Sequence, residues 1–203
     1  MTAPVPASVD VTGIVLAGGR SERFGSDKLA VELDGRPLLH LAIAAVAEMA
    51  GRLVVVVAPG ADQALPEGLV ARIDVVHDRE AFGGPLVGLA AALAAVDTPT
   101  VLVAGGDMPR MVPAVLARLA GAVSGSQRAV TLEVPGRVQP LPMALDVIAA
   151  RAAGAAVLER GGRSLRDLLR ELGAASIPAP VWRALDPAGA TIVDIDRPAD
   201  LGS

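Results

Sequence analysis

The residues best suited to chemistry lie in one short run near the start of the chain. Residues 16–28 read Leu-Ala-Gly-Gly-Arg-Ser-Glu-Arg-Phe-Gly-Ser-Asp-Lys, directly after the apolar stretch Val11–Leu16. Glycines let the backbone turn tightly and bring its N–H groups close to a ligand, while Arg20, Arg23 and Lys28 supply positive charge for phosphates. The run predicts a phosphate-binding loop, and the alternative that remains open is a glycine-rich surface turn with solvated cations.

This run matches neither of the two common phosphate-loop patterns. A Walker loop has a lysine directly after the last glycine of Gly-x-x-x-x-Gly-Lys-Ser/Thr, whereas Lys28 lies three positions after Gly25. A dinucleotide fingerprint requires Gly-x-Gly-x-x-Gly, whereas Gly18 and Gly19 are adjacent. A nicotinamide-dependent oxidoreductase is therefore a poor match to this spacing.

Carboxylates follow two other stretches that read as strands. Asp107 comes after the apolar run Thr100–Ala104 and two glycines, so it is a candidate magnesium ligand. Its alternative role is that of a turn or N-cap residue before the next helix. Asp78 follows Ile73–Val76, where it is placed either to accept hydrogen bonds from a ligand or to cap the loop before Gly83 and Gly84.

Two more carboxylates stand near the end of the chain. Asp194 and Asp196 would point to the same side of an extended segment, because the side-chain period of such a segment is two. They could form a second acidic wall of the cleft. The alternative is that Asp196 is the N-cap of a short helix with Pro198 in its first turn.

The elements that must position these residues follow from the hydrophobic pattern. Strands are predicted at 11–16, 53–58, 73–76, 100–104 and 129–134, and helices at 37–50, 85–96 and 112–123. Continuous apolar strands that alternate with helices are typical of a mostly parallel sheet in an α/β fold. Ligands of such sheets bind beyond the carboxyl ends of the strands, which is where the glycine-rich run, Asp78 and Asp107 fall.

The composition bears on the number of domains, the kind of partner and the kind of metal site. The 203 residues favour one domain, with residues 1–10 as a loose tail and 11–203 as the folded unit. The net charge of −4 and the scarcity of aromatic residues argue against a nucleic-acid partner. The sequence has no cysteine and two histidines, so any metal is expected on carboxylates, which favours Mg²⁺ or Mn²⁺. We expect no signal peptide and no membrane span, and hence a cytoplasmic protein.

Together these segments resemble the molybdenum cofactor guanylyltransferases, within the wider group of sugar-phosphate-type nucleotidyltransferases. Residues 16–28 are similar to the family's Leu-Ala-Gly-Gly-x-Ser-x-Arg-Met-Gly-x-Asp-Lys, which is the most specific match. Residues 84–88 (Gly-Pro-Leu-Val-Gly) resemble its Gly-Pro-Leu-Ala-Gly, and residues 107–109 (Asp-Met-Pro) its Asp-x-Pro. The tail 194–201 resembles Asn-x-Asn-Thr-Pro-Glu-Asp-Leu, and weaker similarities lie at 139–141 and 163–165.

The resemblance implies a single-domain, three-layer, Rossmann-like nucleotidyltransferase fold. It implies the transfer of GMP from GTP to molybdopterin, or to the molybdenum cofactor, with release of pyrophosphate. The residues implied to bind the nucleotide are Leu16, Ala17, Gly18, Gly19, Lys28, Asp78 and Asp107. Those implied to act in catalysis are Arg23, Lys28 and Asp107, and Asp107 is also the implied ligand of Mg²⁺, with Mn²⁺ as a possible substitute.

The chain departs from the family pattern at three positions. Asp194 and Asp196 stand where the family has asparagines, in a region that the resemblance assigns to the acceptor side, and Val57 stands where an asparagine is common. Cytidylyl relatives carry Leu-Ala-Ala-Gly in the loop, so the Gly18-Gly19 pair favours guanine. Two alternatives remain open: a cytidylyl- or uridylyltransferase that acts on another small phosphorylated acceptor, and a nucleotide-binding module without turnover.

Overall fold

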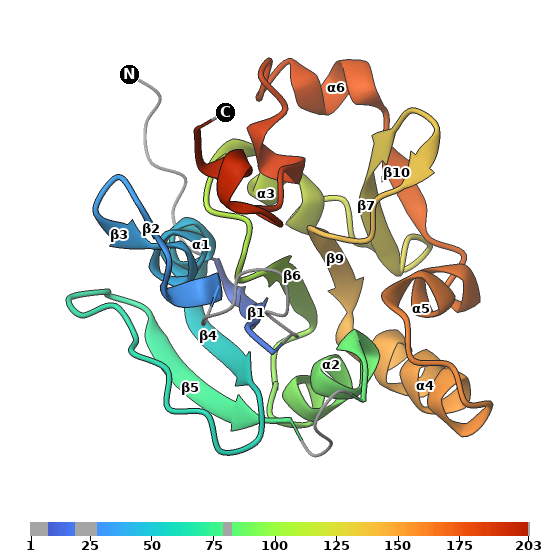
Figure 1. Ribbon diagram of the computed structural model, residues 1–203. Coiled ribbons are helices and arrows are strands. Elements are labelled where there is room, and N and C mark those ends of the chain that lie inside the picture. Colours follow the sequence, from blue (N-terminus) through green and yellow to red (C-terminus); the bar gives the residue numbers. More distant parts are fainter. Residues whose placement is uncertain (1–7, 19–27, 79–82, 203) are drawn as a thin grey trace.

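A mostly parallel β-sheet forms the middle layer of the protein (Figure 1). The computed structural model describes residues 8–18, 28–78 and 83–202. The strands of the main sheet are β1 (Ser8–Leu16), β4 (Ala50–Val57), β5 (Arg72–His77), β6 (Thr100–Gly105), β7 (Ala129–Val134), β8 (Arg137–Val138), β9 (Met143–Asp146) and β10 (Ala175–Ile177). Two further strands, β2 (Glu32–Leu33) and β3 (Arg36–Pro37), pair antiparallel with each other as a separate hairpin.

The strand order is β10-β7-β9-β6-β1-β4-β5, and β8 pairs with β7. β1 runs parallel to both of its neighbours, β4 and β6, and β5 runs parallel to β4. β9 is antiparallel to both β6 and β7, so it interrupts an otherwise parallel path. The carboxyl ends of β1, β4, β5 and β6 therefore meet at one edge of the sheet, as the sequence predicted.

Helices cover both faces of the sheet and complete three layers (Figure 1). One face carries α1 (Leu38–Ala47), α3 (Pro113–Ala120) and α6 (Ala179–Arg183), whose buried side chains share one hydrophobic cluster. The other face carries α2 (Pro85–Ala94), α4 (Val147–Glu159) and α5 (Leu165–Glu171), which share a second cluster. None of the helices in the described part of the chain has the length and apolar content that a membrane crossing requires.

The valine run of β4 explains why the sheet is buried on both sides. Leu53, Val55 and Val57 point into the first cluster, whereas Val54 and Val56 point into the second. This alternation follows from the two-residue period of a strand. The prediction of a strand buried on both faces is confirmed.

Most element boundaries differ from those predicted by one to three residues, and the differences at the start of β1 and the end of α1 have a common cause. β1 begins at Ser8, three residues before the expected start, and α1 ends at Ala47 although a helix through residue 50 was expected. Ala50 instead begins β4 and pairs with Ser8. Alanine has a high intrinsic helix propensity, but pairing with a neighbouring strand overrides that preference here.

The end of the chain returns to the carboxyl edge of the sheet (red in Figure 1). After the short 3₁₀-helix η2 (Ala190–Ile192), residues 193–197 connect to the 3₁₀-helix η3 (Pro198–Gly202). Ile195 is fully buried against Leu33 and Leu38. Its backbone N–H donates to the carbonyl oxygen of Asp107 over 3.0 Å, so this segment is anchored beside the end of β6.

Candidate active site

The loops that follow β1 and β6 lie side by side. Leu16, the last residue of β1, is in register with Gly105, the last residue of β6. Beyond the strands, the N–H of Gly106 donates to the Leu16 carbonyl over 3.0 Å, and the N–H of Ala17 donates to the Val56 carbonyl over 2.7 Å. Ala17 is buried and Gly18 is exposed, so the backbone reaches the surface at the first glycine of the pair.

Lys28 lies between two carboxylates that come from distant parts of the chain. It begins the 3₁₀-helix η1 (Lys28–Ala30), and its Nζ is 2.9 Å from Asp107 Oδ2 and 2.7 Å from Asp196 Oδ1. The Lys28 side chain is 12% exposed, that of Asp107 30% and that of Asp196 52%. The structure thus brings together Lys28 and Asp107, which the sequence predicted at one cleft, and adds Asp196 to them.

These contacts change the electrostatics of the cluster. Burial lowers the pKa of Lys28, but hydrogen bonds and charges from Asp196 and Asp107 outweigh that effect and raise the pKa above its usual value. Because the pKa is higher in the folded state, these ion pairs stabilise the fold below the ordinary lysine pKa of 10.5, and the contribution is lost as the pH rises through the raised pKa.

Asp194 belongs to the same electrostatic group. Loss of hydration raises the pKa of Asp194, and the negative charges of Asp196 and Asp107 add to that rise, although its own backbone N–H and Lys28 oppose it. Asp194 and Asp196 are both exposed, on either side of the buried Ile195. In the described part of this cluster, two carboxylates contact Lys28 and the charge of Lys28 also acts on a third, Asp194, so the negative charges outnumber the positive one.

Asp196 lies in a turn that the carboxylate of Asp200 also stabilises. Its carboxylate binds Lys28, while the carboxylate of Asp200 accepts the N–H groups of Asp196 and Arg197 over 2.9 and 2.8 Å. Asp200 thus serves the turn at the start of η3, where Asp196 was considered as the cap. Asp200 was not singled out from the sequence, because a carboxylate that bonds backward to preceding N–H groups has no fixed motif there.

The carboxylate of Asp107 lies over a position without a side chain. A Cβ on Gly105 would come within 2.6 Å of Asp107 Oδ1, which is closer than real Cβ contacts allow. Glycine at this place makes room for the carboxylate at the end of β6. Carboxylate oxygens are the ligands that Mg²⁺ and Mn²⁺ prefer. Asp107 and Asp196 already bind one cationic group, that of Lys28. The two carboxylates therefore fit a divalent ion.

We expect Gly105→Ala to lower turnover about 10–100-fold while the protein stays folded, because the added methyl group displaces the Asp107 carboxylate by a fraction of an ångström or more. Steady-state rates and a thermal melt on the same sample measure the two effects. Gly51→Ala is a matched control, since a Cβ there meets nothing within 4 Å. If the Gly105→Ala protein is as active as Gly51→Ala, turnover does not depend on the room that Gly105 leaves for the Asp107 carboxylate.

Asp78 lies at the same edge but two strands away from β1. It follows β5, and its N–H donates to the carbonyl oxygen of Val57 over 2.9 Å. Its carboxylate packs beside Gly88 of α2, where a Cβ would lie 3.4 Å from Oδ2. Asp78 is therefore held between the end of the sheet and the first turns of α2.

The glycine before α2 has a structural explanation. Gly84 adopts a φ of 93°, and a Cβ there would lie 2.9 Å from both Cβ and the carbonyl oxygen of Arg163. The N–H of Leu86 donates to that carbonyl over 3.2 Å. The close backbone approach at this glycine is thus made to Arg163, which precedes the Ser164 N-cap of α5.

Some predicted site residues lie outside the described residues. These are Gly19, Arg20 and Arg23 in the glycine-rich run. Among the residues that the structure does describe, no group of three or more His, Asp or Glu side chains is arranged as a ready metal site.

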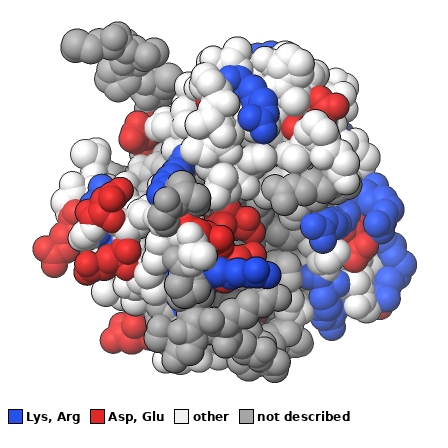
Figure 2. Space-filling model, turned by 45° about the horizontal axis from the view of Figure 1, so that its top comes forward, with Lys and Arg blue, Asp and Glu red and all other residues white. Residues whose placement is uncertain are grey.

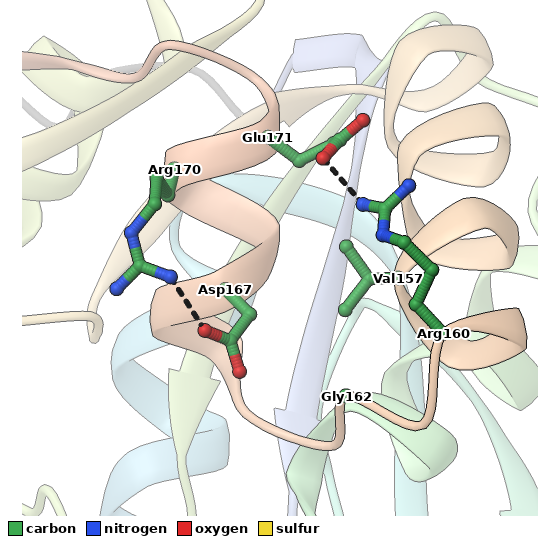
Figure 3. Close-up of a pocket in the computed structure, with 6 residues that line it drawn as sticks. All are labelled: Val157, Arg160, Gly162, Asp167, Arg170 and Glu171. Atoms are coloured by element: carbon green, nitrogen blue, oxygen red, sulfur yellow. Dashed lines mark hydrogen bonds and ion pairs between the residues drawn. The ribbon is translucent and has the colours of Figure 1, made fainter.

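A pocket of about 340 Å³ lies elsewhere, between α4 and α5 (Figure 3). It is lined by Val157, Arg160, Gly162, Asp167, Arg170 and Glu171. Figure 3 shows its two arginines paired with its two carboxylates, Arg160 with Glu171 and Arg170 with Asp167. Basic side chains gather on this side of the molecule in Figure 2. None of the predicted site residues lines this pocket.

Comparison with solved structures identifies the fold class. A structure from Archaeoglobus fulgidus, titled molybdopterin-guanine dinucleotide biosynthesis protein A, superposes with a TM-score of 0.74 at 23% identity, covering 94% of this chain and 95% of that one. The 2-C-methyl-D-erythritol 4-phosphate cytidylyltransferase of Thermus thermophilus gives a TM-score of 0.65 at 24% identity, covering 93% and 94%. The fold is the nucleotidyltransferase fold, as the sequence predicted.

Sequence comparison is more specific. The model of the MobA-like NTP transferase domain matches residues 13–176. A relative from Chloroflexus aggregans, described as a probable molybdenum cofactor guanylyltransferase, is 34% identical over 202 residues, which cover 97% of this chain and 94% of the relative. A molybdenum cofactor guanylyltransferase from Xanthomonas euvesicatoria is 39% identical over 158 residues, covering 77% and 75%. The chain belongs to the MobA-like NTP transferase family.

Proposed function

We propose that this protein transfers the GMP moiety of GTP to molybdopterin or the molybdenum cofactor, forming the guanine dinucleotide cofactor and releasing pyrophosphate. The observation that carries the proposal is the contact between Lys28 and Asp107, at the edge where β1 and β6 end. The names of the relatives, molybdenum cofactor guanylyltransferase, support a guanine nucleotide as donor and the molybdenum cofactor or its pterin precursor as acceptor. Residues 11–203 form the nucleotidyltransferase domain in this proposal.

The loop after β1 supplies the nucleotide site. Leu16, Ala17, Gly18 and Gly19 hold the guanine nucleotide through backbone groups, and Asp78 contacts the nucleotide from the end of β5. Lys28 and Arg23 neutralise the triphosphate, whose negative charge increases on the leaving pyrophosphate during transfer. The backbone reaches the surface at Gly18, which supports this assignment.

The acceptor needs little chemical activation. Its phosphate is already mostly ionised near neutral pH, because the second pKa of a phosphomonoester is about 6. This phosphate attacks the α-phosphorus of GTP in line with the leaving pyrophosphate, and the work of the protein is to position the reactants and balance their charges. No general base is required, so the proposal needs no catalytic histidine.

Asp107 holds the divalent ion, Mg²⁺ or Mn²⁺, in this proposal. When bound, the ion supplies positive charge that polarises phosphate oxygens and offsets the charge of the reacting groups. Asp194 and Asp196 lie on the acceptor side of the same cluster. Their negative charge is offset in part by Lys28, whose Nζ is 2.7 Å from Asp196.

The test is a pyrophosphate assay in which purified protein, Mg²⁺ and molybdopterin are combined with GTP, CTP, UTP or ATP in turn. We expect pyrophosphate release with GTP, together with a product that contains one guanine nucleotide per pterin. Release with CTP or UTP in place of GTP would point to the cytidylyl or uridylyl alternative. Nucleotide binding without release would identify a module that lacks turnover.

Gly18→Ala tests the guanine assignment at the loop itself. A Cβ at Gly18 would lie 3.6 Å from Ala58 N and 3.7 Å from the Val57 carbonyl carbon, which are ordinary contacts, so the fold should be unchanged. We expect the added methyl to lower the preference for GTP over CTP about tenfold, in the range that one methyl group contributes to discrimination. The ratio of kcat/KM for the two nucleotides measures this, and an unchanged ratio would remove the loop from base selection.

A further inference from the structure

Lys28 occupies the place beside Asp107 where the proposed function requires a divalent cation. Its ammonium group is within hydrogen-bond distance of both Asp107 and Asp196 and is largely shielded from solvent. An ammonium nitrogen at 2.7–2.9 Å from carboxylate oxygens is a charge-assisted hydrogen bond of ordinary length. A cation thus already offsets part of the negative charge of these carboxylates in the nucleotide-free protein.

A divalent ion and the Lys28 ammonium compete for the same oxygens. Mg²⁺ binds carboxylate oxygens at about 2.0–2.1 Å, which leaves no room for an ammonium on the same lone pair, and two cations at such a distance repel each other. The two cations therefore exclude each other from Asp107 Oδ2 and Asp196 Oδ1, the oxygens that Lys28 contacts. Among the described residues, the carboxylates near Lys28 do not form a three-ligand metal site by themselves, so phosphate oxygens of a nucleotide would complete the coordination of the ion in this proposal.

The side chain that can move is Lys28. Asp107 follows directly on β6, and its carbonyl oxygen accepts the N–H of Ile195, whose side chain is fully buried. Asp196 is anchored by the bonds from its own N–H and that of Arg197 to Asp200. Lys28 instead ends in a flexible four-carbon stem with a compact charge, which readily exchanges one anionic partner for another.

We propose that Lys28 keeps divalent cations out of the nucleotide-free site and leaves Asp107 only when triphosphate oxygens take over its ammonium group. This inference rests on the proposed function, because it assumes that the anion which draws Lys28 away is a nucleotide triphosphate. Its consequence is an order of events: the protein alone binds the metal weakly, and the nucleotide and the metal bind together. Asp107 is thereby protected from unproductive metal binding.

The first test removes the lysine and measures metal binding without nucleotide or acceptor. Mn²⁺ binding is followed by electron paramagnetic resonance in Lys28→Met and in Arg72→Met. The control also removes one positive charge from an ion pair with an aspartate, but at the opposite end of β5 from the site. We expect Lys28→Met to bind Mn²⁺ at least about tenfold more tightly than Arg72→Met, since the site loses its competing cation.

A double variant tests whether the gain in Mn²⁺ affinity depends on the Asp107 carboxylate. Asp107→Asn added to Lys28→Met should abolish the gain in Mn²⁺ affinity, and a gain that survives this change would overturn the proposal. Equal affinities of Lys28→Met and Arg72→Met would overturn it as well. Circular dichroism confirms that each variant is folded, and Lys28→Gln replaces Lys28→Met if the methionine variant is not.

The second test uses the wild-type chain, in which Lys28 is the only lysine. Protein labelled with ¹³C-lysine therefore gives one set of lysine side-chain NMR signals. We expect Mg²⁺ alone to leave the signals in place at millimolar concentration, and Mg²⁺ with a non-hydrolysable GTP analogue to shift them. A shift of equal size with Mg²⁺ alone would contradict the proposed order.

The two tests separate this inference from the proposed function. The Mn²⁺ measurement contains neither nucleotide nor acceptor, so it holds whatever the reaction proves to be. If the GTP analogue leaves the lysine signals unchanged but a CTP or ATP analogue shifts them, the exchange stands and the guanine assignment fails. If no nucleotide shifts them, the exchange is wrong.

Discussion

Asp107→Asn should lower the rate of nucleotidyl transfer by about a thousandfold while the protein remains folded. The amide keeps the size of the side chain but removes the negative charge that is proposed to hold the divalent ion. The Asp107 side chain is 30% exposed and lies at the end of a buried strand, so loss of its charge should have little effect on the core. Asp107→Ala should have the same effect on transfer.

The measurement is pyrophosphate release with GTP and the molybdopterin acceptor over a range of Mg²⁺ concentrations. Asp97→Asn is a suitable control, because Asp97 also pairs with a cation, Arg52, but its side chain is 83% exposed and lies away from the carboxyl edge of the sheet. Near-normal turnover by a folded Asp107→Asn protein would remove the metal-binding role of Asp107.

Trp182→Ala should lower the free energy of unfolding by about 3–5 kcal/mol. Trp182 is fully buried in the first hydrophobic cluster, its indole N–H donates to the Glu133 carbonyl over 2.9 Å, and the Arg183 guanidinium lies 4.8 Å from its ring centroid. Truncation leaves a large cavity and an unpaired carbonyl group. For a protein of this size the melting temperature should fall by about 6–20 °C.

Urea unfolding and calorimetry measure this loss. Val181→Ala is the matched control in the same helix, since Val181 is 42% exposed, and its effect should stay within about 1 kcal/mol. Equal stabilities of the two variants would show that α6 contributes little to the core.

The parallel part of the sheet was predictable because its strands carry a strong local signal. β4 and β6 contain continuous apolar runs at 53–57 and 101–104, and the strand predicted at 129–134 agrees with β7 in both boundaries. The carboxyl ends of parallel strands meet at one edge, which is why Lys28 and Asp107 could be assigned to one cleft without knowledge of distances.

The remaining features depend on contacts between distant residues. β9 enters the sheet antiparallel between β6 and β7, and a run of four residues gives no indication of its direction or its neighbours. The contact between Lys28 and Asp196 spans 168 positions and depends on the burial of Ile195 against Leu33 and Leu38. Period-two spacing predicted that Asp194 and Asp196 share a side, but not which cation they would meet.

The anchoring of residues 193–202 beside β6 has a practical consequence for recombinant work. A purification tag or fluorescent fusion joined after Ser203 would follow Asp196 by only a few positions, next to the bonds that Asp200 and the Leu201 carbonyl make. The first residue of β1, Ser8, lies at the opposite edge of the sheet, since β1 runs toward Lys28 and Asp107. Expression vectors for kinetic studies should therefore place such additions at the amino terminus.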